Sequence, residues 1–265
     1  YRTTSNANSG GSAWAGTTST TLAPGDYYIY ATICETTNYQ GKTCTQSKFT
    51  VSKGTCGAPS NVSIATDRKV TWTAGSGASS YKVCAATNTS CTPSTALTSG
   101  SAYAAVTDAT GSRRVYVQSQ CNTTYYSSAT SDSAYGTASV VALTISRNNT
   151  SYGTVSASSY NVVSGATYST SSNVLTLNDS RTVTATATAA TGYTTTFSSW
   201  SSTSGTISTS TTVTANFSRT ANKYSCAAGK YLRASDATCQ NCPAGNYCAG
   251  ITNQTYNGNN LGITG

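Results

Sequence analysis

The sequence contains no histidine and no methionine, and it has few charged residues of either sign. Its 265 residues include 15 lysines and arginines but only 7 aspartates and glutamates. Histidine is the commonest general base and metal-ligating side chain, and its absence removes the usual centre of such chemistry. The seven carboxylates lie at least nine residues apart along the chain. We therefore expect no enzyme, with no catalytic residue, cofactor or metal site.

Long apolar stretches and clusters of basic residues are missing as well. No run of about 20 apolar residues and no signal peptide is present, so we expect no membrane span in this segment. The start at Tyr1 and the lack of methionine suggest a processed product or a segment of a longer protein. The net charge is +8, but Arg68-Lys69 and Arg113-Arg114 are the only adjacent basic pairs. A phosphate-binding surface needs clustered basic residues, so we expect no nucleic-acid partner.

Small hydroxyl side chains and tyrosine dominate what is present. The chain has 52 threonines, 42 serines and 19 tyrosines, against three phenylalanines and three tryptophans. Threonine and tyrosine favour the pleated surface of a sheet, while glycine and serine supply turns. No stretch shows helical periodicity over three turns. The sequence predicts an all-β fold of tandem small β-sandwich or β-sheet modules, followed by a short disulfide-rich module.

The ten cysteines are even in number, as a complete set of disulfides requires. The last four could instead hold zinc, or Cys239 and Cys242 could form a redox-active pair, but only these two stand in the two-residue spacing of a zinc knuckle. Disulfides account for all ten at once and imply an oxidising, extracellular or cell-surface location. The predicted disulfide residues are Cys34, Cys44, Cys56, Cys84, Cys91, Cys121, Cys226, Cys239, Cys242 and Cys248.

Such a location would also permit glycosylation. Eight asparagines begin the acceptor pattern N-x-S/T, although a chain so rich in serine and threonine produces many such patterns by chance. The dense hydroxyl groups are further candidates for O-glycosylation. The candidate acceptors are Asn61, Asn88, Asn122, Asn148, Asn149, Asn178, Asn216 and Asn253.

Residues 1–55 end in a tyrosine-rich strand, predicted over 26–33, and a partner strand over 48–51. Cys34 and Cys44 would clip the hairpin between them. The pattern resembles the last two strands of bacterial immunoglobulin-like surface domains. A sandwich of that kind needs about seven strands, and the preceding residues have room for one or two more. We expect a partial immunoglobulin-like domain, with strands missing or supplied in trans.

Residues 56–139 contain a succession of short alternating strands. An early proline (Pro59), a tryptophan on the second strand (Trp72) and a tyrosine opening the third (Tyr81) mark the segment. It resembles a fibronectin type III domain, and the resemblance implies a sandwich with Trp72 in its core.

The cysteines of this segment fit that topology. Cys84 and Cys91 flank one loop that follows the third strand. Cys56 precedes the first strand and Cys121 ends the sixth, and in a seven-strand sandwich these two points lie at the same pole. We therefore expect a bridge between Cys56 and Cys121, which would close a long loop.

Residues 140–219 open with a V-x-L-T-I strand and close with TVTANF at 212–217. With the intervening GYTTTFSSW at 192–200, the segment resembles the B-repeat modules of internalin-type surface proteins. The large rings of this segment are predicted to form the core of a small sheet rather than a platform for stacking sugars. These rings belong to Tyr193, Phe197 and Trp200.

Residues 220–250 carry YSCAAGKYL and CQNCPAGNYC, and resemble the cysteine-rich modules of ephrin-receptor-like extracellular repeats. The resemblance implies that covalent links replace a core. From it we expect bridges Cys226–Cys239 and Cys242–Cys248, although four cysteines allow three pairings. Residues 251–265 are predicted to be an extended tail or linker, either disordered or docked on a sheet edge.

The function that these features favour is structural. We expect an extracellular, glycosylated protomer of a cell-surface fibre or filament that self-associates head to tail. Residues 1–55 would receive a β-strand, and residues 249–265 or another exposed strand would donate it. The alternatives are an adhesin or binding stalk that recognises glycans or a host protein, and an accessory part of a larger secreted enzyme.

Overall fold

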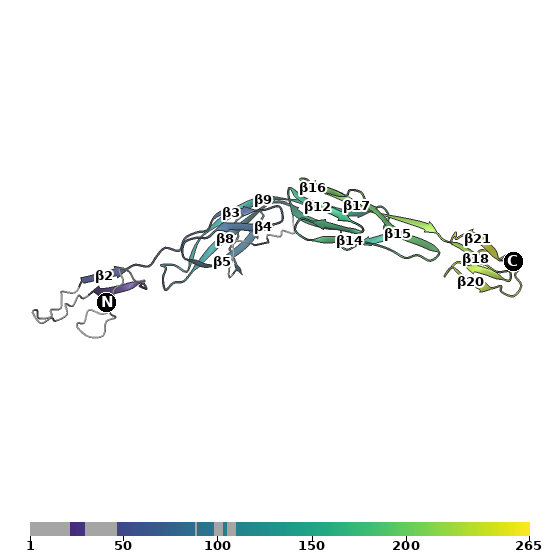
Figure 1. Ribbon diagram of the computed structural model, residues 1–265, viewed down its shortest axis with the longest axis horizontal. Coiled ribbons are helices and arrows are strands. Elements are labelled where there is room, and N and C mark those ends of the chain that lie inside the picture. The colour runs from purple at the N-terminus through teal and green to yellow at the C-terminus, as the bar shows by residue number, and fades with distance from the viewer. Residues whose placement is uncertain (1–21, 30–46, 88, 98–102, 105–109) are drawn as a thin grey trace, which may run out of the picture. The chain divides into compact units, whose positions relative to one another are not determined.

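The computed structural model describes residues 22–29, 47–87, 89–97, 103–104 and 110–265. These residues form 21 β-strands and no helix. The strands belong to several small sheets (Figure 1). The predicted all-β class, with small sheets and disulfides, is confirmed.

The contacts divide the chain into two compact units. The chain passes between the units several times, and the last passage lies inside one long strand, β9 (Thr130–Arg147), between Thr137 and Ala138. The boundary expected from the sequence, between residues 139 and 140, lies two residues further on. The first unit is Tyr1–Ile64, Val70–Tyr103 and Arg114–Thr137, and the second is Ala65–Lys69, Ala104–Arg113 and Ala138–Gly265.

At the start of the first unit, β1 (Gly25–Ile29) and β2 (Ser47–Val51) form a two-stranded antiparallel sheet. Tyr27 lies opposite Phe49, and their rings stack with centroids 5.6 Å apart. The predicted pairing of these two strands is confirmed over the described residues. The Cys34–Cys44 clip lies outside them.

In the remaining strands of the first unit, buried apolar residues alternate with more exposed ones along β4 and β5. In β4, Val70 and Trp72 are buried while the residues between and beside them are exposed, because side chains alternate along a strand. Trp72 contacts the buried Tyr81 edge to face at 5.1 Å, and the predicted burial of Trp72 is confirmed. The strands are β3 (Ser60–Ile64), β4 (Lys69–Thr73), β5 (Ala78–Ala86), β6 (Thr95–Leu97), β7 (Tyr103–Ala104) and β8 (Gly111–Cys121).

Within the second unit, two sheets enclose a core. One contains β15, β17 and β9 in that order, with β11 also paired to β9, and β17 runs parallel to β9. The other has the order β10-β14-β13-β12-β16. The strands are β10 (Gly153–Val155), β11 (Ser159–Val163), β12 (Ala166–Ser171), β13 (Val174–Leu177), β14 (Thr182–Ala187), β15 (Tyr193–Trp200), β16 (Ser204–Ile207) and β17 (Thr211–Ala221).

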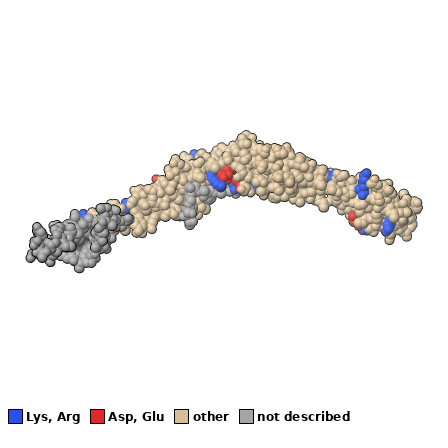
Figure 2. Space-filling model, in the orientation of Figure 1, with Lys and Arg blue, Asp and Glu red and all other residues tan. Residues whose placement is uncertain are grey.

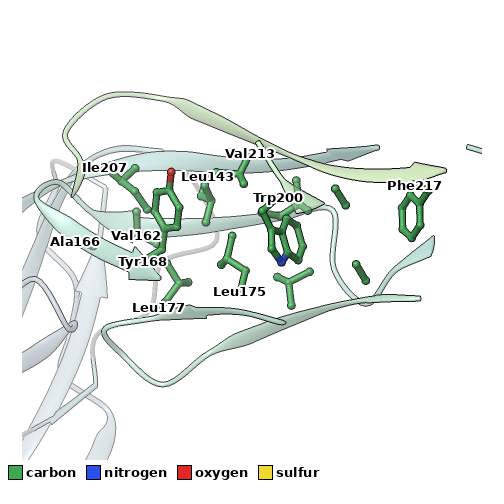
Figure 3. Close-up of a cluster of buried hydrophobic side chains, with 14 residues drawn as sticks. Leu143, Val162, Ala166, Tyr168, Leu175, Leu177, Trp200, Ile207, Val213 and Phe217 are labelled. Carbon is green, nitrogen blue, oxygen red and sulfur yellow. The ribbon is translucent and has the colours of Figure 1, made fainter. Parts of the chain in front are cut away.

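Fourteen buried residues fill the space between these sheets (Figure 3). Leu143, Leu175 and Ile207 are fully buried, and Trp200 lies among them. The predicted core position of Trp200 is confirmed, and the half-buried Phe197 packs against the same cluster. The prediction for Tyr193 is wrong. Its half-buried ring packs instead on the C-terminal segment, because the chain beyond β17 folds back beside the start of β15.

The C-terminal segment consists of two ribbons. β18 (Lys223–Cys226) pairs with β21 (Ile251–Thr255), and β19 (Lys230–Arg233) pairs with β20 (Thr238–Asn241). Residues 251–265 were predicted to be either disordered or docked on a sheet edge. The structure has the second arrangement, because β21 pairs with β18. The small core of the whole C-terminal segment consists of Cys226, Leu232, Ile251 and Tyr256.

Candidate functional site

Four disulfides are present in the described residues, and they are the pairings expected from the sequence. In the first unit Cys56 bonds Cys121 and Cys84 bonds Cys91. In the C-terminal segment Cys226 bonds Cys239 and Cys242 bonds Cys248. The remaining two cysteines, Cys34 and Cys44, lie outside the described residues.

The alternatives for the C-terminal cysteines were a zinc site and a redox-active pair of Cys239 and Cys242. Cys239 and Cys242 bond different partners, so they form neither a dithiol pair nor two ligands of one metal. The thiolate is the metal ligand and the nucleophile of cysteine, and an oxidised sulfur offers neither. Four disulfides are compatible with an oxidising, extracellular environment.

The carboxylates that the structure describes do not gather into one cluster. Among the described residues, no three of histidine, cysteine, aspartate and glutamate lie close enough to hold a metal ion. On the face shown in Figure 2, charged residues are few among the described ones. Four carboxylates instead form ion pairs: Asp26 with Lys48, Asp67 with Lys69, Asp236 with Arg233, and Asp179 with Arg68 and Arg181.

Asp179 is the most deeply buried of these carboxylates, with 3% of its side chain exposed. One oxygen lies 2.7 Å from Arg181 Nη2 and 2.9 Å from Arg68 Nε. Burial by itself would raise the pKa of Asp179. Hydrogen bonds from the Arg181 side chain and backbone, together with the two positive charges, outweigh burial and lower the pKa. The cluster fastens the β3–β4 turn to the β13–β14 turn inside the second unit.

Two exposed carboxylates have lowered pKa values for the same kind of reason. The Lys48 and Thr50 side chains donate hydrogen bonds to Asp26 and lower its pKa. The pKa of Asp236 is lowered chiefly by the hydrogen bond from Arg233. Both groups stay ionised near neutral pH, so neither is suited to act as a general acid there.

A groove of about 570 Å³ lies beside the end of β15. One wall comes from the β12–β13 hairpin, with Thr170, Ser172 and Asn173. The other comes from β15 and the turn after it, with Phe197, Ser198, Trp200 and Thr203 among its residues. No charged side chain lines the groove, which combines aromatic rings, hydroxyl groups and one amide.

A β-bulge positions the two rings. Phe197 lies opposite Phe217 and Trp200 opposite Ala215, so the pairs are three residues apart on β15 but two apart on β17. In a regular strand, residues three apart face opposite sides of the sheet. The extra residue turns both rings to the same side, where their centroids lie 5.6 Å apart. This groove was not predicted from the sequence. Phe197 and Trp200 stand three residues apart in one strand, and two large apolar rings at that spacing were a signal of the bulge.

The candidate glycosylation sites differ in how free their side chains are. Asn61, Asn122, Asn178 and Asn253 are exposed, Asn149 and Asn216 are half-buried, and Asn88 lies outside the described residues. Asn148 has a structural role, because its Nδ2 donates to Phe217 O and its Oδ1 accepts from Phe217 N, both at 2.9 Å. A glycan on Asn148 would disturb both bonds, so this acceptor fits the structure least well.

The described residues contain no helix of the length and apolarity needed to cross a membrane.

Comparisons of the chain with known protein families, curated proteins and solved structures found no match. The immunoglobulin-like, fibronectin-like, B-repeat-like and ephrin-receptor-like resemblances therefore stay predictions.

Proposed function

We propose that this chain is a non-catalytic structural protein of the cell surface, and that copies of it assemble head to tail into a fibre. All-β modules, four disulfides and ion-paired carboxylates support this role. The four module resemblances and the candidate glycosylation sites point the same way.

The observation that carries the proposal is the two-stranded sheet of β1 and β2. It is the whole of that sheet among the described residues. A two-stranded sheet is at best marginally stable, and three or more strands are needed for independent stability. The exposed backbone edge of such a sheet can accept a strand from another molecule.

The pairing of β21 supports one choice of donated strand. The segment 251–265 does not hang free, because β21 pairs with β18 and because Ile251 and Tyr256 are buried. Among the described residues, β21 nevertheless has a hydrogen-bonded neighbour on one side alone. We propose that its other edge adds to the β1–β2 sheet of the next copy. This contact joins two different surfaces and does not close on itself, so it extends into a filament.

The test is electron microscopy and sedimentation of the full chain over a range of concentrations. We expect filaments for the natural sequence and monomers for the double variant Thr252→Lys, Gln254→Lys, because charged edge residues block strand pairing. Thr212→Lys with Thr220→Lys is the matched control, since both residues are exposed on the interior strand β17. Monodisperse natural protein at high concentration, or filaments unchanged by the β21 variant, would contradict the proposal.

Glycan recognition is the second candidate. It is favoured by one observation, the uncharged groove beside β15, and it concerns a surface separate from β1, β2 and β21.

A further inference from the structure

The groove beside β15 has the chemistry of a site for an uncharged, hydroxyl-rich ligand. Its volume of about 570 Å³ is that of a small-molecule site. Phe197 is half-buried, so part of its ring supports the core and part faces the groove. Aromatic faces of this kind pack against the apolar C–H faces of sugar rings.

The polar groups of the groove are only partly used within the protein. Asn173 Nδ2 donates to Ala185 O at 2.8 Å, and Ala185 N donates back to Asn173 O at 2.8 Å. The first bond holds the side-chain amide and leaves its Oδ1 as an acceptor, and the second holds the Asn173 backbone. Among the described residues, the hydroxyls of Ser172, Ser198 and Thr203 have no hydrogen-bond partner.

The backbone around the groove is also specialised. Ser172 has a φ of 50°, the left-handed conformation that residues other than glycine rarely adopt. On the opposite wall, the bulge between Phe197 and Ser199 leaves an extra residue, Ser198, at the groove. Bulges are found next to binding sites because they redirect side chains. Both walls therefore depart from regular strand geometry at the residues that line the groove.

We propose that this groove binds one ring of a neutral oligosaccharide. The Phe197 ring would stack on the sugar, and Asn173 Oδ1 would accept a hydrogen bond from a sugar hydroxyl. Ser172, Ser198 and Thr203 can each donate and accept, which matches the alternating donors and acceptors of a polyol. An acidic sugar is disfavoured, because no cation lines the groove to compensate its charge.

The experiment is an array of neutral and acidic oligosaccharides probed with the full chain, followed by calorimetric titration of the best neutral ligand. We expect Phe197→Leu to weaken binding roughly 10-fold, because leucine fills the core but lacks a ring face. We expect Thr203→Glu to weaken it by a similar factor, because it places a charge at the mouth of the groove. Thr212→Glu, an equally exposed threonine on β17, should leave the affinity within about two-fold.

Near-ultraviolet circular dichroism establishes that each variant is folded, so that loss of binding is distinguished from unfolding. Three results would overturn the proposal: no neutral ligand on the array, binding to acidic ligands alone, or equal affinity in Phe197→Leu and Thr203→Glu. Sedimentation of Thr203→Glu adds a fourth, because a change in oligomeric state would show that a second copy covers the groove. None of these results depends on filament formation through β1, β2 and β21.

Discussion

Two neighbouring parts of the second unit are stabilised by different means. Residues 138–219 enclose fourteen buried side chains and contain no cysteine. Residues 223–265 bury four residues in their cluster and contain two disulfides. The first part has two sheets that face each other across a shared interior, whereas the second has only two-stranded ribbons.

The size of the enclosed interior decides whether a core or a crosslink stabilises each part. Two packed sheets remove many side chains from water, and each large buried side chain contributes roughly 1.5–3 kcal/mol. Ribbons of four or five residues cannot enclose such a volume, so the unfolded chain must be restricted covalently instead. The buried indole N–H groups of Trp72 and Trp200 have no hydrogen-bond partner among the described residues. Each unsatisfied N–H costs about 1–3 kcal/mol, and the burial of many apolar side chains offsets this cost.

The largest effect should come from breaking the core. Leu175→Ala leaves a cavity at a fully buried position and should cost about 4 kcal/mol. Hydrogen exchange should show lost protection in residues 140–219 and little change in 223–265. The reciprocal variant is Leu232→Ala, at the fully buried leucine of the C-terminal segment. It should affect 223–265 alone, and equal loss in both segments from either variant would contradict the comparison.

Removing one crosslink should come next. Cys226→Ser with Cys239→Ser opens a link that spans 13 residues, and the expected cost is about 3 kcal/mol. Amides of 223–265 should lose protection from hydrogen exchange while those of 140–219 keep theirs. Cys84→Ser with Cys91→Ser is the control, because that bridge lies in the first unit. If amides of 223–265 keep full protection without the 226–239 bridge, the covalent explanation is wrong.

The charge cluster at Asp179 should contribute less. Asp179→Asn leaves Arg68 and Arg181 without their shared partner and should cost about 2 kcal/mol at neutral pH. Asp132→Asn, at an exposed carboxylate, should change stability by less than about 0.5 kcal/mol. Chemical denaturation at neutral pH measures both, and an equal effect of the two variants would argue against a role for the cluster.

The same cluster predicts a dependence on pH. The folded-state pKa of Asp179 is lowered, so its contribution is fully present above the unfolded pKa of about 4. It is lost as the pH falls through the lower folded pKa. Denaturation curves should therefore show that Asp179→Asn loses less stability on acidification than the natural sequence. Parallel acid profiles for the two proteins would exclude this contribution.

The smallest effect should come from the contact between the two parts. Gly192 has a φ of 77°, and a Cβ there would lie 2.2 Å from the ring of Tyr256. Gly192→Ala should cost about 1.5 kcal/mol from backbone strain and displacement of the ring. Gly229→Ala, at a φ of 79° with open space around it, should cost about 1 kcal/mol from strain alone. Equal melting temperatures for the two variants would show that the Tyr256 contact adds nothing.

Much of the fold could be predicted from the sequence, because its signals are local or covalent. Alternation in KVTWT places Val70 and Trp72 on one buried face, and this follows from the period of a strand. The resemblance of the C-terminal segment to a cysteine-rich module implied the two bridges that are observed there. The candidate groove could not be predicted in this way. It needs the β12–β13 hairpin to meet β15, and β14 separates the hairpin from β15 in the chain.

The sequence by itself determined an all-β chain, because hydroxyl-rich and tyrosine-rich segments without helical periodicity suit pleated strands. Tertiary structure alone decided three other features. Tyr193 packs on Tyr256, Phe197 and Trp200 share one face through a bulge, and Asp179 lies between two arginines. Each depends on a contact with another segment of the chain: Tyr256 for Tyr193, β17 for the bulge, and Arg68 for Asp179. Register and burial, rather than local preference, set the position of a side chain in such contacts.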